Sequence, residues 1–320
     1  MKKIFLTLGV CLLLAGCNGL SPAPPTATWT PPPSPTETGS PTPTASVTPT
    51  FTPSLTPTPE WTIQGPDRIT VPIILYHHIA VSPVDSEYYV PPSDFEDQLR
   101  ILRDWGYTSI STELLVRAIT QGAPLPPRPI ILTFDDGDIS VYANGFPLMK
   151  KYGFTGVFYL VSNYLNAEGF VSTAQVKEMA AAGWEIGSHT IGHTALVDLA
   201  SDLLRKEVVE SKERLEAELG LPVRTIAYPF GAADPRVLDY AKFAGYIAGM
   251  GLGPIPVQDL NHLYYLQRRD IKGSYDIKTF IFFLPWQGDP AFIPTDTPTA
   301  TPLPSRTPIP TYTQYPTRTP

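Results

Sequence analysis

Cysteine, long hydrophobic runs and clustered basic residues are all scarce in this sequence of 320 residues. Its two cysteines, Cys11 and Cys17, lie near the start, so a domain further along the chain must draw its stability from its core rather than from disulfides. The apolar run Ile4–Ala15 is too short for an ordinary transmembrane helix. The formal net charge is −7 and no dense run of Lys or Arg occurs, which argues against a nucleic-acid-binding protein.

The first residues have the features of a secretory signal. Two lysines precede the apolar run, and small residues follow it. The ending Leu14-Ala15-Gly16-Cys17 resembles the bacterial lipobox, in which the cysteine becomes the lipid-modified first residue of the mature protein. We therefore expect residues 1–17 to be a lipoprotein signal peptide, and Cys17 to anchor an exported protein at the bacterial cell envelope, on its extracytoplasmic side. An ordinary cleaved signal that happens to contain a cysteine is the alternative.

Proline, by contrast, is abundant, with 38 residues concentrated together with Thr towards both ends. Segments 18–62 and 288–320 have too little apolar surface to offset the entropy of ordering, so we predict that both are disordered. In polyproline geometry, the first segment would reach on the order of 100 Å from the membrane as a tether. Residues 63–287 are long enough for one sizeable core and are predicted to form a single domain.

Short apolar runs alternate with stretches of helical periodicity in this central region. Strands are predicted at 71–76, 130–134, 156–161, 184–187, 224–228, 246–250 and within 263–271. Helices are predicted at 93–105, 147–152, 172–182, 201–219, 234–244 and 278–284. This alternation implies parallel strands joined by right-handed crossovers. Seven such units favour an α/β barrel, in which the chemistry lies at the carboxyl ends of the strands.

Two serines are candidate caps for these helices. Ser93 is the predicted N-cap of the first helix and Ser201 of the long one. In the first helix, Phe95, Leu99 and Leu102 would share one buried face.

Polar residues follow the apolar runs, as an active site at the strand ends requires. They are His77 and His78; Asp135, Asp136 and Gly137; Ser188, His189 and His193; Pro229, Phe230 and Gly231; and Arg268, Arg269 and Asp270. On a helical turn, the spacing of His189 and His193 would put both imidazoles on one face, close enough to bind one ion. Alone, such a pair is more readily a solvated turn, and Asp-Asp-Gly a strand-ending turn. Their joint position at one end of the barrel favours a metal site.

Three stretches, in this order, resemble the motifs of the polysaccharide deacetylases, which are NodB-like carbohydrate esterases: TFDDG at 133–137, SHTIGH at 188–193 and YPFG at 228–231. The opening PIILYHH at 72–78 resembles the branch that includes the poly-N-acetylglucosamine deacetylases. The resemblance covers about 71–283. It implies a single distorted (β/α)7 barrel.

The resemblance also implies the roles of individual residues. Asp136, His189 and His193 would bind one divalent metal ion; Zn²⁺ suits these ligands, and Co²⁺, Ni²⁺ or Fe²⁺ would also fit. Asp135 would be the general base beside the metal-bound water. The backbone N–H of Phe230 would stabilise the oxyanion together with the metal.

One departure from the family concerns an arginine that orients the base. Many relatives have it two residues before the Pro of the third motif, where this chain has Ala227. Arg268 is the candidate substitute, and Arg269 is a weaker one. A salt bridge at the end of the barrel is the alternative explanation for Arg268.

The other departure concerns the general acid. Many relatives supply it from a Leu-x-His motif near the C-terminus, but here Leu260-Asn261-His262 lies in a polar loop. In the branch with the Tyr-His opening, a histidine at the first strand end has this role. His77 is therefore predicted to be the acid, with His78 as the alternative, unless either is only a structural histidine at the barrel end.

The leading hypothesis is a metal-dependent hydrolase that removes acetyl groups from an N-acetylated polysaccharide of the cell envelope or its surroundings, of peptidoglycan, poly-N-acetylglucosamine or chitin type. An O-acetyl (xylan) esterase would use the same residues, and a non-catalytic sugar-binding lipoprotein is a further alternative. We expect a monomer whose partners are the acetylated polysaccharide and, through lipid on Cys17, the membrane, with no nucleic acid.

Overall fold

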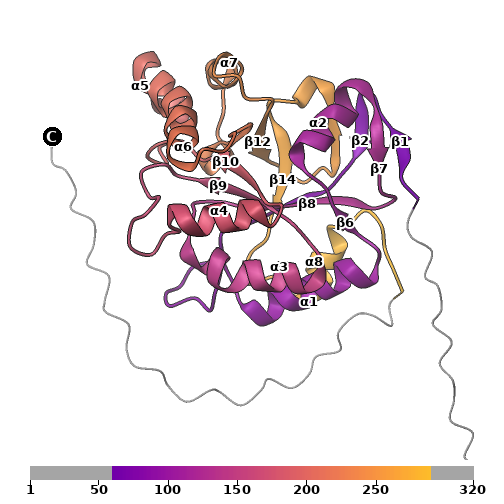
Figure 1. Ribbon diagram of the computed structural model, residues 1–320. Helices are drawn as coiled ribbons and strands as arrows, with labels where there is room; N and C mark the ends of the chain where they lie inside the picture. The colour runs from indigo at the N-terminus through magenta and orange to yellow at the C-terminus, as the bar shows by residue number, and fades with distance from the viewer. Residues whose placement is uncertain (1–59, 290–320) are drawn as a thin grey trace, which may run out of the picture. The chain divides into compact units, whose positions relative to one another are not determined.

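The computed structural model describes residues 60–289 of the chain (Figure 1). The predicted signal peptide with Cys17 lies outside the described residues, as do nearly all of the Pro/Thr-rich segments 18–62 and 288–320. Among residues 60–289, no helix is long and apolar enough to cross a membrane.

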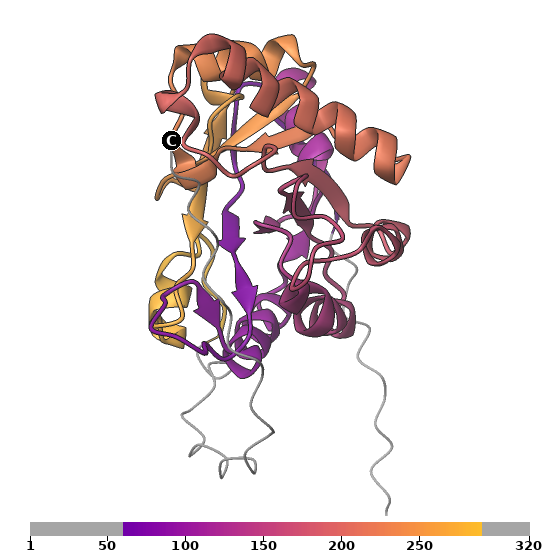
Figure 2. The same cartoon turned by 90° about the vertical axis from the view of Figure 1, so that its left-hand side faces the viewer.

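Seven parallel strands form a closed barrel, in which each strand pairs with the next and the last pairs with the first. In order around the barrel they are β3 (Ile73–Tyr76), β8 (Pro129–Phe134), β9 (Val157–Leu160), β10 (Glu185–Ser188), β11 (Thr225–Ala227), β12 (Ala248–Leu252) and β14 (Leu266–Asp270). Helices lie around the strands on several sides (Figure 1, Figure 2). The predicted α/β barrel of seven units is therefore confirmed.

Successive residues of these strands face alternately into the barrel and towards the helices. Ile73, Ile131 and Leu266 belong to the apolar cluster inside the barrel. Their neighbours Ile74 and Leu132 belong to the cluster between the strands and the helices. The strands are buried on both faces, and for this reason they appear in the sequence as continuous apolar runs.

The barrel is irregular at two places. One edge of β8 is shared between two partners, because its first residues pair with the short strand β6 (Thr108–Ser109) and its last residues pair with β9. Between β10 and β11 a single pair of residues, Ser188 and Ile226, is in register. The barrel is thus distorted, as the family resemblance implied.

Eight α-helices cover the barrel in the described part of the chain. They are α1 (Pro92–Asp104), α2 (Thr112–Gln121), α3 (Phe146–Tyr152), α4 (Thr173–Ala181), α5 (Ser201–Arg205), α6 (Ser211–Leu219), α7 (Pro235–Phe243) and α8 (Ile277–Phe282). The predicted apolar face of α1 is confirmed, because Phe95, Leu99 and Leu102 are fully buried. The sequence patterns missed α2, although Ser111 caps it by accepting a hydrogen bond from its third residue.

Both predicted serine N-caps are wrong. Ser93 lies inside the first turn of α1, because the helix begins at Pro92, whose fixed φ suits a first helical position. Ser201 is the first residue of α5, and no side chain caps that helix. Ser172 and Asp234 do cap α4 and α7.

The predicted long helix at 201–219 has an irregular middle. A π-helical turn, η3 (Lys206–Glu210), separates α5 from α6. Gly220 ends the helix in a left-handed conformation. Strand β12 begins at Ala248, two residues later than predicted. Tyr246 lies before the strand, and its hydroxyl donates a hydrogen bond to the Val208 carbonyl of the π-turn.

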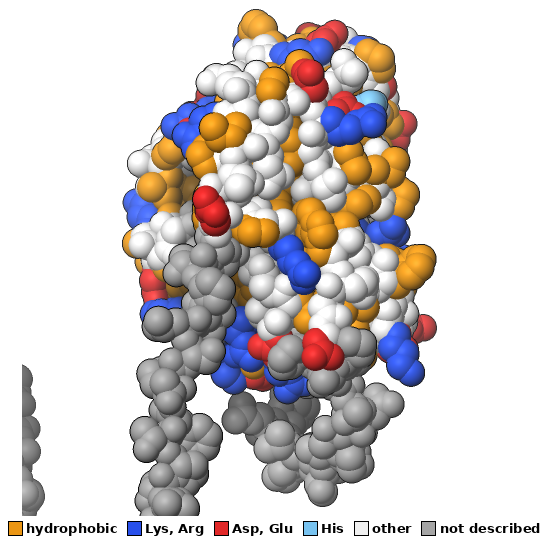
Figure 3. All heavy atoms as spheres, turned by 90° about the vertical axis from the view of Figure 1, so that its right-hand side faces the viewer, with side chains coloured by type: hydrophobic (Ala, Val, Ile, Leu, Met, Phe, Trp, Pro, Cys, Tyr) orange, Lys and Arg blue, Asp and Glu red, His pale blue; other side chains and the backbone are white. Residues whose placement is uncertain are grey.

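Short antiparallel pairs that were not predicted lie at the amino end of the barrel. β1 (Thr62–Gln64) pairs with β7 (Ala123–Leu125), and β2 (Arg68–Thr70) pairs with β13 (Val257–Asp259). Figure 3 shows the side of the molecule that carries β1 and β7, with Lys and Arg scattered among Asp and Glu rather than gathered in one patch. At the carboxyl end, a short parallel pair joins β4 (His78–Ile79) to β5 (Tyr89–Val90).

Candidate active site

Polar side chains gather at the carboxyl ends of the barrel strands, as predicted. His77 follows β3, Asp135 follows β8, and His189 follows β10. The last pair in register between β3 and β8 is Tyr76 with Phe134, so His77 and Asp135 leave their strands at the same level. Residues far apart in the sequence thus meet at one end of the barrel.

Three potential metal ligands converge at this end. The Oδ1 of Asp136 lies 3.5 Å from Nε2 of His189 and 3.4 Å from Nε2 of His193. One ligand atom from each of the three residues lies within 4.8 Å of the other two. Within residues 60–289, this is the one group of His, Asp, Glu or Cys side chains with such spacing.

The chemistry of this cluster suits a divalent cation. Asp136 Oδ1 is shielded from solvent and makes no hydrogen bond. Its distances to the two imidazole nitrogens are those of atoms that share one tetrahedral ion at bond lengths of about 2.0–2.2 Å. Burial, and then the neighbouring His189, lower the pKa of His193, which favours the neutral ring that a metal ligand must have.

The orientation of His189 is fixed by a backbone carbonyl. Its Nδ1 lies 2.8 Å from the carbonyl oxygen of Ala227, the last residue of β11. Since a carbonyl oxygen only accepts, Nδ1 carries the proton and Nε2 presents its lone pair towards Asp136. No side-chain pattern indicates this contact, because any residue at 227 supplies the same carbonyl.

The segment that carries the two histidines is a loop, not the helical turn that their spacing suggested. Thr190 and His193 have left-handed backbone conformations, with φ of 68° and 54°. The N–H of His193 donates to Oγ1 of Thr190 at 3.2 Å. The two imidazole rings, with centroids 4.8 Å apart, therefore meet through the fold of the loop.

Asp135 is 2% exposed and forms a bidentate ion pair with Arg268 of β14. Nη1 and Nη2 of Arg268 each donate to one carboxylate oxygen at 2.7 Å. Burial alone would raise the pKa of Asp135, but the charges of Arg268 and His189 lower it to about 2. The carboxylate is therefore ionised at neutral pH, and its Oδ2 lies 3.7 Å from His189 Nε2, beside the cluster.

Arg268 is itself held inside the barrel. Its Nε donates to the Gly251 carbonyl at 3.2 Å, and its guanidinium carbon lies 5.4 Å from the centre of the Tyr159 ring. Arg269 faces the other way along β14 and donates to the Pro254 carbonyl. Of the two candidates, Arg268 is the one that contacts Asp135.

His77 faces the same cluster. Burial lowers the pKa of its ring, whereas the charges of Asp135 and Asp136 raise it. Its Nδ1 lies 3.6 Å from Oδ1 of Asp270, the last residue of β14, and its ring centroid is 4.7 Å from that of Tyr88. Burial raises the pKa of Asp270 to about 6. Sequence reasoning noticed Asp270 at a strand end but gave it no role.

The other histidine candidates have different surroundings. Nδ1 of His78 lies 3.1 Å from Oδ2 of Asp138, and its ring stacks on Tyr89 with centroids 4.1 Å apart. His262 is paired with Asp259 at 2.8 Å and is 62% exposed, next to β13 at the amino end of the barrel. His78 is thus paired with Asp138, and His262 lies at the other end of the barrel, whereas the charges of Asp135 and Asp136 act on the pKa of His77.

Phe230 lies in the turn after β11, with a left-handed φ of 60°. Its ring is 65% exposed, and its centroid lies 4.9 Å from that of His193. The Tyr265 hydroxyl donates to the Gly231 carbonyl at 2.6 Å and anchors the turn. Phe230 thus borders the cluster, and the use of its backbone N–H stays a prediction.

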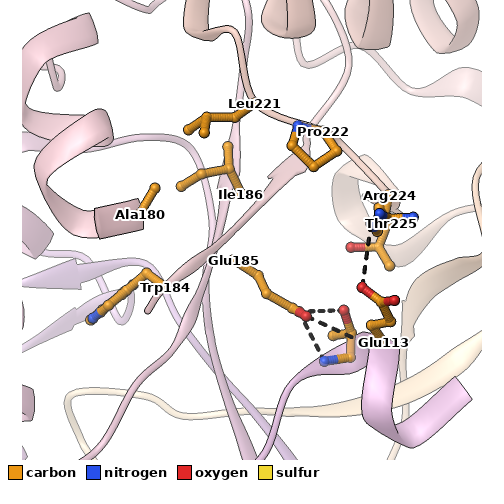
Figure 4. A pocket seen from close by; sticks show the side chains of 10 residues that line it. Glu113, Ala180, Trp184, Glu185, Ile186, Leu221, Pro222, Arg224 and Thr225 are labelled. Carbon is orange, nitrogen blue, oxygen red and sulfur yellow. Dashed lines mark hydrogen bonds and ion pairs between the residues drawn. The ribbon is translucent and has the colours of Figure 1, made fainter. Parts of the chain in front are cut away.

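A surface pocket lies beside the first residues of β10 and β11, at the amino end of the barrel (Figure 4). Its wall includes Glu185, the first residue of β10, whereas the potential metal ligand His189 follows the last residue of that strand. Each of its three charged side chains is already paired: Glu185 accepts hydrogen bonds from Thr112, and Arg224 forms an ion pair with Glu113. The pocket is therefore separate from the cluster.

The chain resembles known proteins over the region that builds this site. Residues 122–249 match the family model described as polysaccharide deacetylase. The chain is 28% identical over 276 residues to YxkH of Bacillus subtilis (strain 168), which is assigned to the polysaccharide deacetylases; the match covers 84% of this chain and 93% of that protein. It is 27% identical over 195 residues to a poly-beta-1,6-N-acetyl-D-glucosamine N-deacetylase of Staphylococcus aureus, covering 57% and 67%.

Solved structures show the same likeness. The Streptococcus pyogenes deacetylase PplD, in complex with acetate, is 27% identical with a TM-score of 0.63, covering 68% of this chain and 98% of that one. IcaB from Ammonifex degensii is 27% identical with a TM-score of 0.56, covering 65% and 93%. The barrel and these likenesses define a carbohydrate-modifying hydrolase. Over the barrel and its site, the chain is similar to the polysaccharide deacetylases.

Proposed function

We propose that the protein is a metal-dependent hydrolase that removes acetyl groups from an N-acetylated polysaccharide. The observation that carries this proposal is the convergence of Asp136, His189 and His193 beside the buried carboxylate of Asp135. A protein that only bound sugar would have no chemical need for an ionised carboxylate next to three potential metal ligands.

Asp135 is suited to be the general base. Arg268 keeps the Asp135 carboxylate ionised and fixes its plane with two hydrogen bonds. These two bonds also set the directions of the remaining lone pairs of the carboxylate. A divalent cation, for which Zn²⁺ is the leading candidate, would lower the pKa of a water molecule and polarise the acetyl carbonyl if held by Asp136, His189 and His193. Asp135 takes a proton from the water as its oxygen bonds to the carbonyl carbon.

His77 is suited to be the general acid on the other side of the scissile bond. As the bond between the acetyl carbon and nitrogen breaks, His77 gives a proton to the nitrogen, which leaves as the free amine, and the acetyl group leaves as acetate. Asp270, near Nδ1 of His77, orients the ring so that Nε2 is available for this transfer. The Phe230 backbone N–H is the proposed donor to the oxyanion.

The proposed substrate is an N-acetylated glycan of the peptidoglycan, poly-N-acetylglucosamine or chitin type. One similar protein is named for the N-deacetylation of poly-beta-1,6-N-acetyl-D-glucosamine, and another was solved with acetate, which is the small product of this reaction. Both share 27% of their residues with this chain over the aligned regions. This support concerns the acetyl chemistry more directly than the identity of the sugar.

We also propose that the enzyme works as a monomer outside the cytoplasm, at the bacterial cell envelope. The support for this location is in the sequence: a lipobox-like ending at Cys17 and a Pro/Thr-rich segment between it and the barrel. Such a segment would let a lipid-anchored domain reach glycan at a distance from the membrane.

Acetate release from N-acetylated and O-acetylated glycans tests the function, with and without a chelator. We expect release from an N-acetylated glycan that the chelator abolishes and added Zn²⁺ or Co²⁺ restores. Release from O-acetylated xylan alone would replace the N-acetyl assignment by an esterase. No release from any acetylated glycan at full metal occupancy would refute both enzymatic functions.

The matched variant is Asp135→Asn. It keeps the size of the side chain and leaves Asp136, His189 and His193 unchanged, so metal binding should persist while turnover falls by at least about 100-fold. Metal content and acetate release are measured on the same sample. A fully active variant would show that Asp135 is not the base.

A further inference from the structure

A single carboxylate oxygen supports the loop between the two histidines. The N–H groups of Ile191 and Gly192 both donate to Oε2 of Glu207, at 2.8 and 2.9 Å. These two amides are consecutive in a loop that has no helical hydrogen bonds of its own. Consecutive backbone N–H groups form a concave site for an anion, and here a side chain of the same protein fills that site.

The position of Glu207 depends on the π-helical turn η3. Glu207 is the second residue of this turn, between α5 and α6. Within this turn, the Val208 carbonyl accepts hydrogen bonds from Ser211 Oγ at 3.0 Å and from the Tyr246 hydroxyl at 3.1 Å. Single π-turns inside helices are frequent at functional sites, because they re-aim the neighbouring side chains.

The same stretch of helix also holds the start of the loop. Ser188 Oγ donates to Ser211 Oγ at 2.8 Å and accepts from the Thr190 N–H at 3.1 Å. All three side chains are fully buried. The loop is therefore attached to one helix at both of its ends, through Ser211 before His189 and through Glu207 before His193.

We propose that Glu207 is the positioning residue for the second histidine of the metal site. Its carboxylate, by binding the amides of Ile191 and Gly192, fixes the left-handed conformation in which His193 Nε2 points to Asp136. This inference rests on the proposed metal binding by Asp136, His189 and His193. It assigns to Glu207 a role that the likeness of the motifs does not indicate, because Glu207 lies 14 residues after the second histidine.

The test is a titration of the full chain with Co²⁺, in which the visible absorption spectrum of the bound ion is recorded. A competition titration then measures the affinity for Zn²⁺. Glu207→Ala leaves two amides without their acceptor, and we expect metal binding to weaken by about 10–100-fold with an altered Co²⁺ spectrum, because groups that orient metal ligands have effects of this size. Glu207→Gln retains a carbonyl oxygen that accepts from both amides, so most of the affinity should return.

Two further variants separate this role from general damage. Glu210→Ala removes a carboxylate from the same π-turn, where it pairs with Arg214 on the surface, and should bind metal as the unchanged protein does. Glu207→Asp keeps the charge but shortens the side chain by one methylene, so its reach to the amides fails and binding should weaken. This variant decides the matter if Glu207→Ala does not fold.

A second readout needs no metal. In the metal-free chain, the amide hydrogens of Ile191 and Gly192 should exchange faster in Glu207→Asp than in Glu210→Ala. If the unchanged protein bound Co²⁺ and the folded Glu207→Asp or Glu207→Ala variant bound it equally well with the same spectrum, the role of Glu207 would be refuted and the proposed function would stand. If the unchanged protein bound no metal, both would fail.

Discussion

The buried pair of Asp135 and Arg268 gives the most direct test of how the site is built. We consider Arg268→Met, which keeps much of the side-chain volume and removes the guanidinium. Both residues of the pair are almost completely buried, with exposures of 2% and 1%. The variant therefore leaves a carboxylate without its partner in a place that water does not reach.

The magnitude follows from the burial and the pKa. Removing one partner of a buried ion pair costs about 3–5 kcal/mol of unfolding free energy. A pKa of about 2 for Asp135, instead of its ordinary 3.8, corresponds to roughly 2–3 kcal/mol of stability. That stability is present above pH 3.8 and is lost as the pH falls through about 2.

The sign reverses in the variant. Without the guanidinium, burial raises the pKa of Asp135 above its ordinary value. A raised carboxyl pKa means that the native state loses stability as the pH rises through it. The difference in unfolding free energy between the unchanged protein and Arg268→Met should therefore be largest near pH 7 and smaller, by about 1 kcal/mol or more, at pH 4.5.

Urea unfolding in the presence of a chelator, at pH 7 and pH 4.5, measures these differences without a contribution from bound metal. The double variant Asp135→Asn/Arg268→Met should recover at least half of the loss at pH 7, because no charge is left buried. Arg268→Lys is the control for geometry, since it keeps the charge but not the bidentate contact. If the two single effects simply added in the double variant, the pair would not be coupled and the reasoning would be wrong.

Two further predictions concern stability and catalysis together. Asp270→Asn should lower kcat by roughly 10-fold or more, because the ring of His77 loses its partner. Burial raises the pKa of Asp270 to about 6, so its ionisation above that pH destabilises the folded state. The same variant should therefore raise the unfolding free energy by about 1 kcal/mol at pH 8 but not at pH 4. Equal stability changes at both pH values would contradict this. Ser172→Ala removes the capping box of α4 and should cost about 1 kcal/mol, or a Tm lower by about 2–4 °C, with kcat unchanged. An unaltered Tm would show that the cap contributes nothing.

The sequence alone determined the barrel and the end at which its chemistry lies. Each strand is buried on both faces, so each appears as an apolar run that ends where the chain turns polar. Because every crossover returns the chain to a parallel strand, all these ends meet at one rim. The period of two along β8 even predicts that Asp135, two residues after the buried Thr133, continues a series of inward-facing side chains.

Local rules were less reliable at the helix starts and in the histidine loop. A serine before a helical pattern predicts an N-cap, but α1 begins at Pro92, so Ser93 lies inside the helix. The four-residue spacing of His189 and His193 suggested a helical turn, and the structure has a loop instead. Several backbone paths bring two such residues together, so their spacing does not select one.

Only the tertiary structure decided which groups support the site. Arg268 and Arg269 are adjacent in sequence. Because side chains alternate along β14, only Arg268 of the two points to Asp135, whereas Arg269 donates to the Pro254 carbonyl. The acceptor for His189 is a main-chain carbonyl at Ala227, which no side-chain pattern records. Glu207 and Asp270 reach the site from other elements because of a π-turn and a strand register. Motifs record the residues that are proposed to meet the substrate and metal, whereas the contacts that orient those residues depend on distances that exist only after folding.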